Sequence, residues 1–293
     1  MEHSSLAYGV GADAPWTEQF VRVNGITLHI VEAGPTTAPL VLLLHGFPDH
    51  CASWRFQLPA LADRYRVVAP DLRGYNLSDK PAWGYDVATL AADIRELIYA
   101  LGYHEAAIVG HDWGGFIAWV VGIREPEVVR KLAILNAPHP AMLTRGWKHP
   151  GQLRRSAYIA LFQLRGIAER AIERENYALL WQTLRAADRG RAWLTDDDIQ
   201  RNIDAIRRPG ALSAALEYYR QLPHALAQAS PMRVIHAPTL LLWGELDPYL
   251  GPWMADELEP WAPDLHVKRL PTLGHWPHLQ APEHINAALQ AFL

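Results

Sequence analysis

The sequence predicts an α/β protein: a mostly parallel sheet flanked by helices, with a helical segment inserted between two parts of the sheet. Short apolar runs alternate with amphipathic stretches over residues 1–138 and again over 234–293, and this alternation is typical of parallel βαβ units. Residues 139–233 have helical spacing throughout and contain 15 of the 27 basic residues. We therefore expect two parts of one α/β core, 1–138 and 234–293, with a helical cap between them.

The first part of the core begins with a hairpin. Phe20–Val23 and Ile26–Val31 flank Asn24-Gly25, a dipeptide typical of tight β-turns, so we expect an antiparallel edge of the sheet here. Continuous apolar runs, typical of strands covered on both faces, follow at Leu40–Leu44, Tyr65–Ala69, Ala106–Val109 and Leu132–Leu135. The spacing between these runs predicts helices over Cys51–Asp63, Asp86–Leu101 and Gly114–Arg124.

The second part of the core continues the same alternation. Pro238–Trp243 and Leu265–Leu270 are predicted to be strands, and Trp253–Leu258 and Pro282–Leu293 are predicted to be helices. We expect these elements to extend the sheet of the first part.

The composition is that of a globular protein. With 50% hydrophobic and 20% charged residues, the chain is not disordered, and a net charge of −4 gives no basic excess for nucleic acid. No apolar run approaches the ~18 residues of a membrane-spanning helix, and residues 1–16 show no signal-peptide pattern. Cys51 is the only cysteine, which excludes an internal disulfide and a thiolate zinc cluster. We expect a cytoplasmic protein that binds neither nucleic acid nor membrane, either as a monomer or as a dimer.

The segment Gly110–Gly114 joins a predicted strand to a predicted helix. Small residues at both ends suit a sharp strand–turn–helix elbow that lifts the central side chain, here Asp112, into a pocket. A serine hydrolase is disfavoured, because no Gly-x-Ser-x-Gly occurs in the chain. An Asp at such a turn is also a common helix N-cap, so this segment alone leaves a catalytic and a structural interpretation open.

Three further segments lie at the ends of predicted strands: His45–Pro48, Trp243–Asp247, which contains Asp247, and Gly274–Trp276, which contains His275. The carboxyl ends of parallel strands lie at one edge of a sheet, where open α/β proteins bind their ligands. Four such segments would not be expected to follow strands by coincidence. Together they favour a catalytic site.

The order of these residues indicates their roles. Asp112, Asp247 and His275 follow one another as nucleophile, acid and base do in an α/β-hydrolase triad. The backbone N–H groups of Phe47 and Trp113 are the candidates for an oxyanion hole.

These segments resemble those of α/β-hydrolase-fold epoxide hydrolases, and the resemblance covers essentially the whole chain. The matching segments are His45–Pro48, Asp71–Tyr75, Ser78–Pro81, Gly110–Gly115, Leu135–Pro140, Gly244–Asp247 and Gly274–Trp276. The resemblance implies the α/β-hydrolase fold and the addition of water to an epoxide to give a vicinal diol. It also implies a covalent ester on Asp112, hydrolysed by water that His275 and Asp247 activate. We expect no cofactor and no metal. Two departures are Arg165, where the family often has Pro, and Asn76, which replaces a usual Gly.

The resemblance places proton donors in the cap. Members of the family use two lid tyrosines for the epoxide oxygen, and the matching segments carry these roles to Tyr158 and Tyr219, with Tyr218 as the rival for the second. We expect a small apolar epoxide to contact both tyrosines and three further residues, His45, Trp113 and Trp276.

Alternatives stay open. A haloalkane dehalogenase would use the same triad, with the Trp113 indole and a second donor for the halide. Phe47 occupies the position where Asn would serve, so a cap tryptophan, Trp147 or Trp181, would have to substitute. Fluoroacetate dehalogenases typically carry Arg directly after the nucleophile, where this chain has Trp113. A non-catalytic ligand-binding protein of the same fold would lack catalytic groups, and none is missing.

Overall fold

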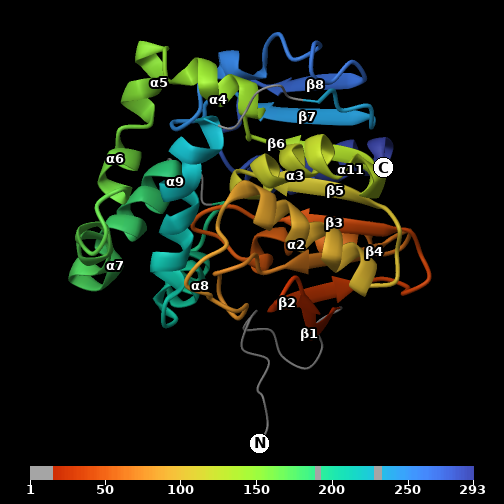
Figure 1. Ribbon diagram of the computed structural model, residues 1–293, viewed down its shortest axis with the longest axis horizontal. Helices are drawn as coiled ribbons and strands as arrows, with labels where there is room; N and C mark the ends of the chain where they lie inside the picture. The colour runs from red at the N-terminus through yellow and green to blue at the C-terminus, as the bar shows by residue number, and fades with distance from the viewer. Residues whose placement is uncertain (1–15, 189–192, 228–232) are drawn as a thin grey trace, which may run out of the picture.

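Within residues 16–188, 193–227 and 233–293, which the computed structural model describes, the centre of the molecule is an eight-stranded sheet (Figure 1). The strands lie in the order β1-β2-β4-β3-β5-β6-β7-β8. Their bounds are β1 Thr17–Val23, β2 Ile26–Ala33, β3 Leu40–Leu44, β4 Arg66–Pro70, β5 Ala106–His111, β6 Val129–Leu135, β7 Thr239–Gly244 and β8 Leu265–Leu270. The segment before Trp16, where we found no signal-peptide pattern, lies outside the described residues.

The sheet is parallel except at one edge. Strands β3 to β8 run parallel, whereas β2 is antiparallel to both β1 and β4. The hairpin between β1 and β2 turns at Asn24 and Gly25, whose φ values of 42° and 80° are those that a tight hairpin turn requires. The predicted α/β class, with a mostly parallel sheet and flanking helices, is confirmed.

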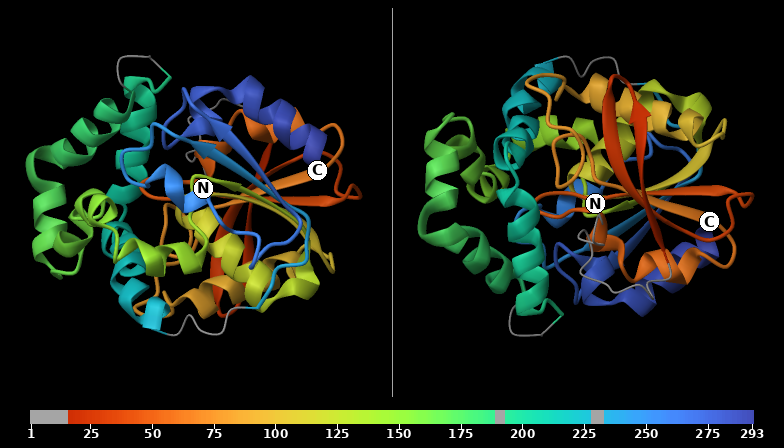
Figure 2. Two further views of the ribbon diagram at one scale, coloured as in Figure 1. Left: turned by 90° about the horizontal axis from the view of Figure 1, so that it is seen from above. Right: turned by 90° about the horizontal axis from the view of Figure 1, so that it is seen from below.

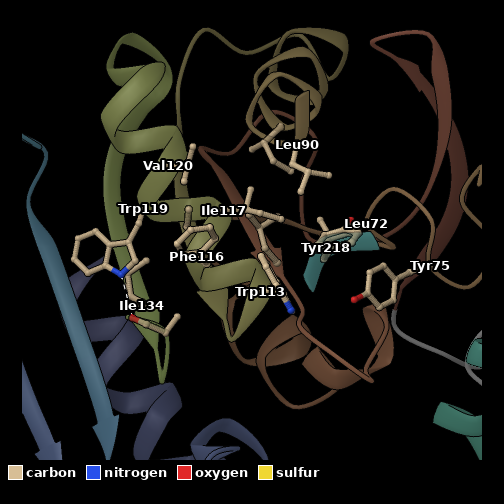
Figure 3. Close-up of a cluster of buried hydrophobic side chains, with 14 of the residues drawn as sticks. Leu72, Tyr75, Leu90, Trp113, Phe116, Ile117, Trp119, Val120, Ile134 and Tyr218 are labelled. Atoms are coloured by element: carbon tan, nitrogen blue, oxygen red, sulfur yellow. Dashed lines mark hydrogen bonds between the residues drawn. The ribbon is translucent and has the colours of Figure 1, made fainter. Parts of the chain in front are cut away.

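Helices cover both faces of the sheet. In the core they are α1 Gln57–Leu61, α2 Val87–Ala100, α3 Trp113–Arg124, α10 Pro277–Gln280 and α11 Pro282–Phe292, with short 3-10 turns η1 Cys51–Trp54, η2 Pro126–Val128 and η3 Pro252–Ala255. Successive side chains of a strand point to opposite faces: Leu42 packs in the cluster that contains α2 and α3, and Leu43 in the cluster that contains α1 and α11. Figure 3 shows part of the first cluster, in which Phe116 and Ile117 of α3 lie near Leu90 of α2.

Two predicted helices are shorter than expected. The helix predicted over Cys51–Asp63 is divided into η1 and α1, because Pro59 has no N–H to bond to the preceding turn and is tolerated only near the start of a helix. The helix predicted over Trp253–Leu258 is only the turn η3. It ends at Asp256, which is extended, and Glu257 follows with a φ of 54°.

The remaining helices all lie between β6 and β7 in the chain, and we call them the cap. They are α4 Pro140–Gly146, α5 Pro150–Arg155, α6 Tyr158–Phe162, α7 Ile167–Asp188, α8 Asp196–Arg207 and α9 Ala211–Ala227. Figures 1 and 2 show the cap stacked against one end of the sheet. Helix α7 is interrupted by non-helical backbone over residues 174–177. Among the described helices, none has the length and apolarity to cross a membrane.

Candidate active site

Asp112 lies at the elbow between β5 and α3. Its backbone has a φ of 51° and a ψ of −120°, which non-glycine residues rarely adopt and which is typical of functional sites. The neighbouring glycines make the turn possible, because a Cβ on Gly114 would lie 2.1 Å from the carbonyl oxygen of Leu44. The close approach of α3 to β3 projects the Asp112 side chain beyond the end of the sheet.

The loop after β3 lies against the Asp112 carboxylate. The backbone N–H of Phe47 donates to Oδ1 of Asp112 (2.9 Å). Gly46 leaves room for this contact, since a Cβ there would lie 2.3 Å from the same oxygen. Trp113 is the first residue of α3, where backbone N–H groups have no partner within the helix. Both predicted oxyanion donors thus border the elbow, and that of Phe47 already contacts the carboxylate.

His45 lies beneath this loop, outside the pocket. Its side chain is fully buried. Nε2 accepts from the backbone N–H of Leu72 (3.0 Å), and Nδ1 donates to the carbonyl oxygen of Gly46 (2.9 Å). Burial lowers the pKa of His45, which agrees with a neutral ring that has one donor and one acceptor. We expected His45 to contact the substrate, but both ring nitrogens are occupied by backbone groups, so its place in the structure is to hold the loop.

His275 and Asp247 lie next to Asp112. Nδ1 of His275 is hydrogen-bonded to Oδ2 of Asp247 (2.6 Å), and Nε2 lies 3.5 Å from Oδ2 of Asp112. The second oxygen of Asp247 accepts from the backbone N–H groups of Tyr249 (2.7 Å) and Leu250 (3.0 Å). The three residues of the predicted triad therefore meet at the end of the sheet, with the imidazole between two carboxylates.

Asn136, directly after β6, holds Asp247 and was not singled out from the sequence. Its amide nitrogen donates to Oδ2 of Asp247 (2.8 Å) and to the carbonyl oxygen of Gly244 (3.1 Å), and its amide oxygen accepts from the N–H of Gly244 (2.8 Å). Asn136 is fully buried and has a φ of 40°. The signal in the sequence is an Asn directly after an apolar strand, because Asn tolerates this backbone conformation better than most residues.

The charges of the site hold His275 in its protonated form. Burial lowers the pKa of His275, but the charge of Asp247 and the contact with Asp112 outweigh burial and raise the pKa to about 10. Burial raises the pKa of Asp112, but His275 and the N–H of Phe47 outweigh burial and lower it. At neutral pH the Asp112 carboxylate is therefore ionised without the help of a base.

Two cap tyrosines line the same cavity as Asp112. Tyr158 of α6 and Tyr219 of α9 line this cavity together with Asp112, and the centroids of their rings lie 6.0 Å apart. Burial and nearby charge raise the pKa of both phenols, so both keep their protons at neutral pH. Tyr218 is directed elsewhere, because its hydroxyl donates to the carbonyl oxygen of Arg73 (2.7 Å). Figure 3 shows Tyr218 within the apolar cluster. The geometry thus distinguishes Tyr219 from its neighbour.

The cavity has a volume of about 200 Å³ and is mostly apolar. Helix α7 supplies much of its wall through Ile172, Leu179, Leu180, Thr183 and Leu184. The hydroxyl of Thr183 donates to the carbonyl oxygen of Leu179 within the helix (2.8 Å). This wall is suited to an apolar group.

Trp276 lines the cavity as expected, and Tyr249 is an unexpected lining residue. The ring centroid of Tyr249 lies 5.1 Å from that of His275 and 5.9 Å from that of Tyr158. The cap tryptophans that a dehalogenase would need, Trp147 and Trp181, are not among the residues that line this cavity.

A second buried carboxylate, Asp49, lies close to the His275 loop. Oδ2 of Asp49 accepts from the indole N–H of Trp276 (2.9 Å) and from the hydroxyl of Ser53 (3.1 Å), while Oδ1 accepts from the amide of Asn202 in α8 (3.1 Å). Burial raises the pKa of Asp49 to about 6, although the first two hydrogen bonds lower it. Asp49 thus connects the loop after β3 with the His275 loop and with the cap.

Two buried clusters in the described part of the chain contain side chains of metal-ligating types, namely His29–Cys51–Asp71 and Asp49–His111–His278. The carboxylates of both are already used in hydrogen bonds. Asp71 binds Nδ1 of His29 (2.7 Å) and the backbone N–H of Cys51 (2.9 Å), and Asp49 makes the contacts given above. We assign a metal to neither cluster.

The arrangement suits nucleophilic displacement at a saturated carbon. An ionised carboxylate from the core and two protonated phenols from the cap line one apolar cavity, and an imidazole lies next to the carboxylate. A carboxylate that displaces a leaving group becomes an ester, which the imidazole and an N–H donor are placed to hydrolyse. The fold and the site thus define a hydrolase-fold protein with a carboxylate, an imidazole and two phenols at one cavity.

Comparisons with known proteins agree with this class. The family model described as alpha/beta hydrolase fold matches residues 39–282. The AB hydrolase superfamily protein YfhM of Bacillus subtilis is 39% identical over 280 residues, which are 94% of this chain and 97% of that protein. Epoxide hydrolase 4 of Mus musculus is 38% identical over 293 residues, with 94% of this chain and 79% of that protein covered.

Solved structures give the same result. The epoxide hydrolase of Bacillus megaterium in complex with an inhibitor has a TM-score of 0.87 and 33% sequence identity, over 94% of this chain and 99% of that chain. Epoxide hydrolase A of Mycobacterium thermoresistibile has a TM-score of 0.85 and 31% identity, over 95% and 98% of the two chains. The chain belongs to the α/β-hydrolase-fold epoxide hydrolase family.

Proposed function

We propose that this protein adds water to a small apolar epoxide and forms a vicinal diol through a covalent ester on Asp112. The observation that carries the proposal is the placement of two protonated phenols, Tyr158 and Tyr219, over the same cavity as the Asp112 carboxylate. An epoxide carbon must be attacked from the side opposite its C–O bond, while the ring oxygen needs a proton. A nucleophile from the core and acids from the cap, all lining one cavity, meet both requirements.

In the first step, Oδ2 of Asp112 is the attacking atom, because Oδ1 accepts the N–H of Phe47. A new C–O bond forms to Oδ2 as the C–O bond of the ring breaks, and the electron pair of that bond goes to the ring oxygen. This oxygen takes a proton from Tyr158 or Tyr219. Such proton donation accelerates a reaction by about 10²–10⁴-fold.

Ester formation changes His275. The ester is neutral, so the charge and the contact of Asp112 no longer raise the pKa of His275. The imidazolium then gives up its proton, which replaces the one that the tyrosine donated. His275 is thereby neutral and able to act as a base.

In the second step, His275 takes a proton from water, and the oxygen of that water attacks the ester carbonyl carbon. The oxyanion forms on Oδ1 and is stabilised by the N–H groups of Phe47 and Trp113, where the loss of one donor typically costs about 10²–10³ in rate. The bond from this carbon to Oδ2 then breaks, and the departing oxygen takes the proton from His275. The second proton of the water, left on the new carboxyl oxygen of Asp112, passes to His275. The products are the diol, the restored carboxylate and the restored imidazolium.

The substrate is proposed to be apolar because of the lining of the cavity. Leucines and an isoleucine of α7 face it, and Trp276 lies on the side of the core. A phenyl or short alkyl substituent on the epoxide matches this lining. The cytoplasmic location stays a prediction from the sequence.

The proposal is tested with purified protein and a panel of aryl and alkyl epoxides and, separately, bromoalkanes. Diol and bromide are both quantified, with Asp112→Ala as the blank. We expect diol without bromide. Bromide without diol would assign the site to dehalogenation, and the absence of both products would contradict the proposal for these substrates.

The intermediate gives a second test. In His275→Gln, Asp112 should still be alkylated while hydrolysis is blocked, so the intact protein should gain the mass of the epoxide. Replacing both Tyr158 and Tyr219 by Phe in the His275→Gln protein should prevent this mass gain, while the circular dichroism spectrum remains that of the folded protein. Full activity of the double Phe variant would show that the acids lie elsewhere.

A further inference from the structure

The cap meets the sheet at the loop that holds Asp247, and one buried side chain bridges the two. Gln152 of α5 is only 4% exposed. Its amide nitrogen donates to the carbonyl oxygen of Tyr249 (2.7 Å), and its amide oxygen accepts from the backbone N–H of Gly251 (3.0 Å). A side chain that both donates to a loop and accepts from it fixes the orientation of that loop relative to α5.

The bridged loop also orients the pair His275–Asp247. The N–H of Tyr249 donates to Oδ1 of Asp247 (2.7 Å), while the carbonyl oxygen of the same residue accepts from Gln152. A second side chain of α5, that of Arg155, donates to the carbonyl oxygen of Asp247 (2.7 Å). A shift of the loop relative to α5 would therefore displace Asp247 and change its 2.6 Å hydrogen bond to His275.

On the other side, Gln152 is connected to the chain that leads to Tyr158. Its amide nitrogen also lies 2.9 Å from the hydroxyl oxygen of Ser156, at the junction between α5 and α6. Tyr158 is the first residue of α6, and its ring faces that of Tyr249 edge-on, with the centroids 5.9 Å apart. Gln152 thus contacts both the segment that carries the proton donor and the loop that carries the acid of the triad.

We propose that Gln152 is a positioning residue that sets the distance between Tyr158 and the pair His275–Asp247. The proposal rests on the function proposed above for the roles of those groups. Gln152 is not among the residues that line the catalytic cavity, so it acts through Tyr249 and Ser156. A displacement of reacting groups by about 1 Å, caused by a mutation away from the reacting atoms, can slow the chemical step by about 10²-fold.

Gln152→Met tests the proposal, because methionine is similar in length but cannot donate a hydrogen bond and accepts one only weakly. The matched control is Gln182→Met, the same substitution at an exposed position of α7. Transient kinetics would measure the rates of ester formation and ester hydrolysis. The low-field proton resonance of the His275–Asp247 hydrogen bond would be recorded without substrate. We expect Gln152→Met to lower both rates by up to about 10²-fold and to shift the resonance, and Gln182→Met to change neither.

A Gln152→Met protein with an unchanged resonance and unchanged rates would overturn the proposal. So would a protein that melts at a lower temperature but keeps both values per folded molecule, since that result indicates structural support alone. If the unaltered protein makes no diol, the proposed function fails. The resonance of the His275–Asp247 hydrogen bond then shows by itself whether Gln152 positions this pair. Gln152→Leu gives the same readouts if the Met variant does not fold.

Discussion

The charge of Asp112 controls the protonation of its neighbour His275. In the free protein two carboxylates flank the imidazole, and together they raise its pKa to about 10 in spite of burial. A base with this pKa is occupied by a proton at neutral pH. Under the proposed mechanism, alkylation of Asp112 removes one of the two charges, so the site produces its own base when the ester needs it.

Asp112→Asn tests this coupling, because the amide is neutral like the ester. We expect the pKa of His275 to be lower in Asp112→Asn than in the unaltered protein. The sign follows from the loss of a negative charge that stabilises the imidazolium. A nuclear magnetic resonance titration of the ring protons of His275 in both proteins gives the two values. Equal pKa values would contradict the coupling.

The adjacent pair Tyr218 and Tyr219 permits a matched comparison. Tyr219→Phe should slow ester formation by up to about 10²-fold, because one of the two proton donors is lost. Tyr218→Phe should leave this rate unchanged but lower the free energy of unfolding by about 1–2 kcal/mol, because the buried carbonyl of Arg73 loses its donor. Stopped-flow kinetics and urea denaturation of both variants check the two effects. A slower ester formation in Tyr218→Phe together with a lower stability of Tyr219→Phe would assign the proton donor to Tyr218 instead.

At the scale of the elements, the elbow depends on the close approach of α3 to β3. A Cβ on Gly114 would lie 2.1 Å from the carbonyl oxygen of Leu44, so Gly114→Ala must push the helix away from the strand. We expect the free energy of unfolding to fall by about 1–3 kcal/mol and the diol-forming rate to fall as well, since Asp112 directly precedes this helix. Urea denaturation measures the first effect. A variant as stable and active as the unaltered protein would show that the elbow tolerates a wider gap.

The core strands were predictable from the sequence because the sheet is covered on both faces. Leu40–Leu44 is a run without polar residues, and the run and the strand coincide. The prediction of one continuous helix over Cys51–Asp63 was wrong, because the periodicity of apolar residues does not show that Pro59 has no N–H. Local patterns thus identify elements best where burial is continuous, and less well where a single residue interrupts the backbone hydrogen bonds.

The site was predictable only in part, for a related reason. Asp112, Asp247 and His275 each follow a strand, and parallel strands bring such residues to one edge. The sequence does not show in which direction a side chain points. We therefore expected His45, which also directly follows a strand, to contact the substrate, whereas its side chain lies beneath the loop. Asn136 and Gln152 bind the loop after β7, which lies far from both in the sequence. The position of Asn136 directly after an apolar strand was a signal that we did not use, whereas no local pattern marks Gln152.

At the scale of the whole molecule, the cap is attached to the sheet through buried polar side chains. Asp49 accepts from Asn202 of α8, and Asn76 accepts from Nε of Arg208 (2.8 Å) at the end of the same helix. Asn76 is the residue that replaces a usual Gly. It has a φ of 39°, and its amide also donates to Asp71 (2.8 Å). This departure from the family pattern therefore adds a contact between the cap and the core.

The stability of this connection should depend on pH. The pKa of Asp49 is raised from its usual 3.8 to about 6, so the folded protein holds a proton that the unfolded chain releases. The stability that this proton provides is complete below about pH 4 and is lost as the pH rises to 6. Asn does not titrate, so Asp49→Asn does not lose stability in this way. The difference in free energy of unfolding, Asp49→Asn minus the unaltered protein, should therefore rise by up to about 3 kcal/mol over this pH range. Urea denaturation of both proteins between pH 4 and 7 measures the difference, and a constant difference would contradict the raised pKa.

The two oxygens of the Asp112 carboxylate are not equivalent, because Oδ1 contacts the N–H of Phe47 whereas Oδ2 faces His275. Under the proposed mechanism, each turnover releases Oδ2 in the diol and replaces it with an oxygen from water. In water enriched in heavy oxygen, the first diol that each molecule makes should carry no label, and every later diol should carry it. An oxygen that enters Asp112 from water in one turnover thus leaves in the diol of the next turnover. As long as the carboxylate does not rotate, Oδ1 stays in the protein throughout.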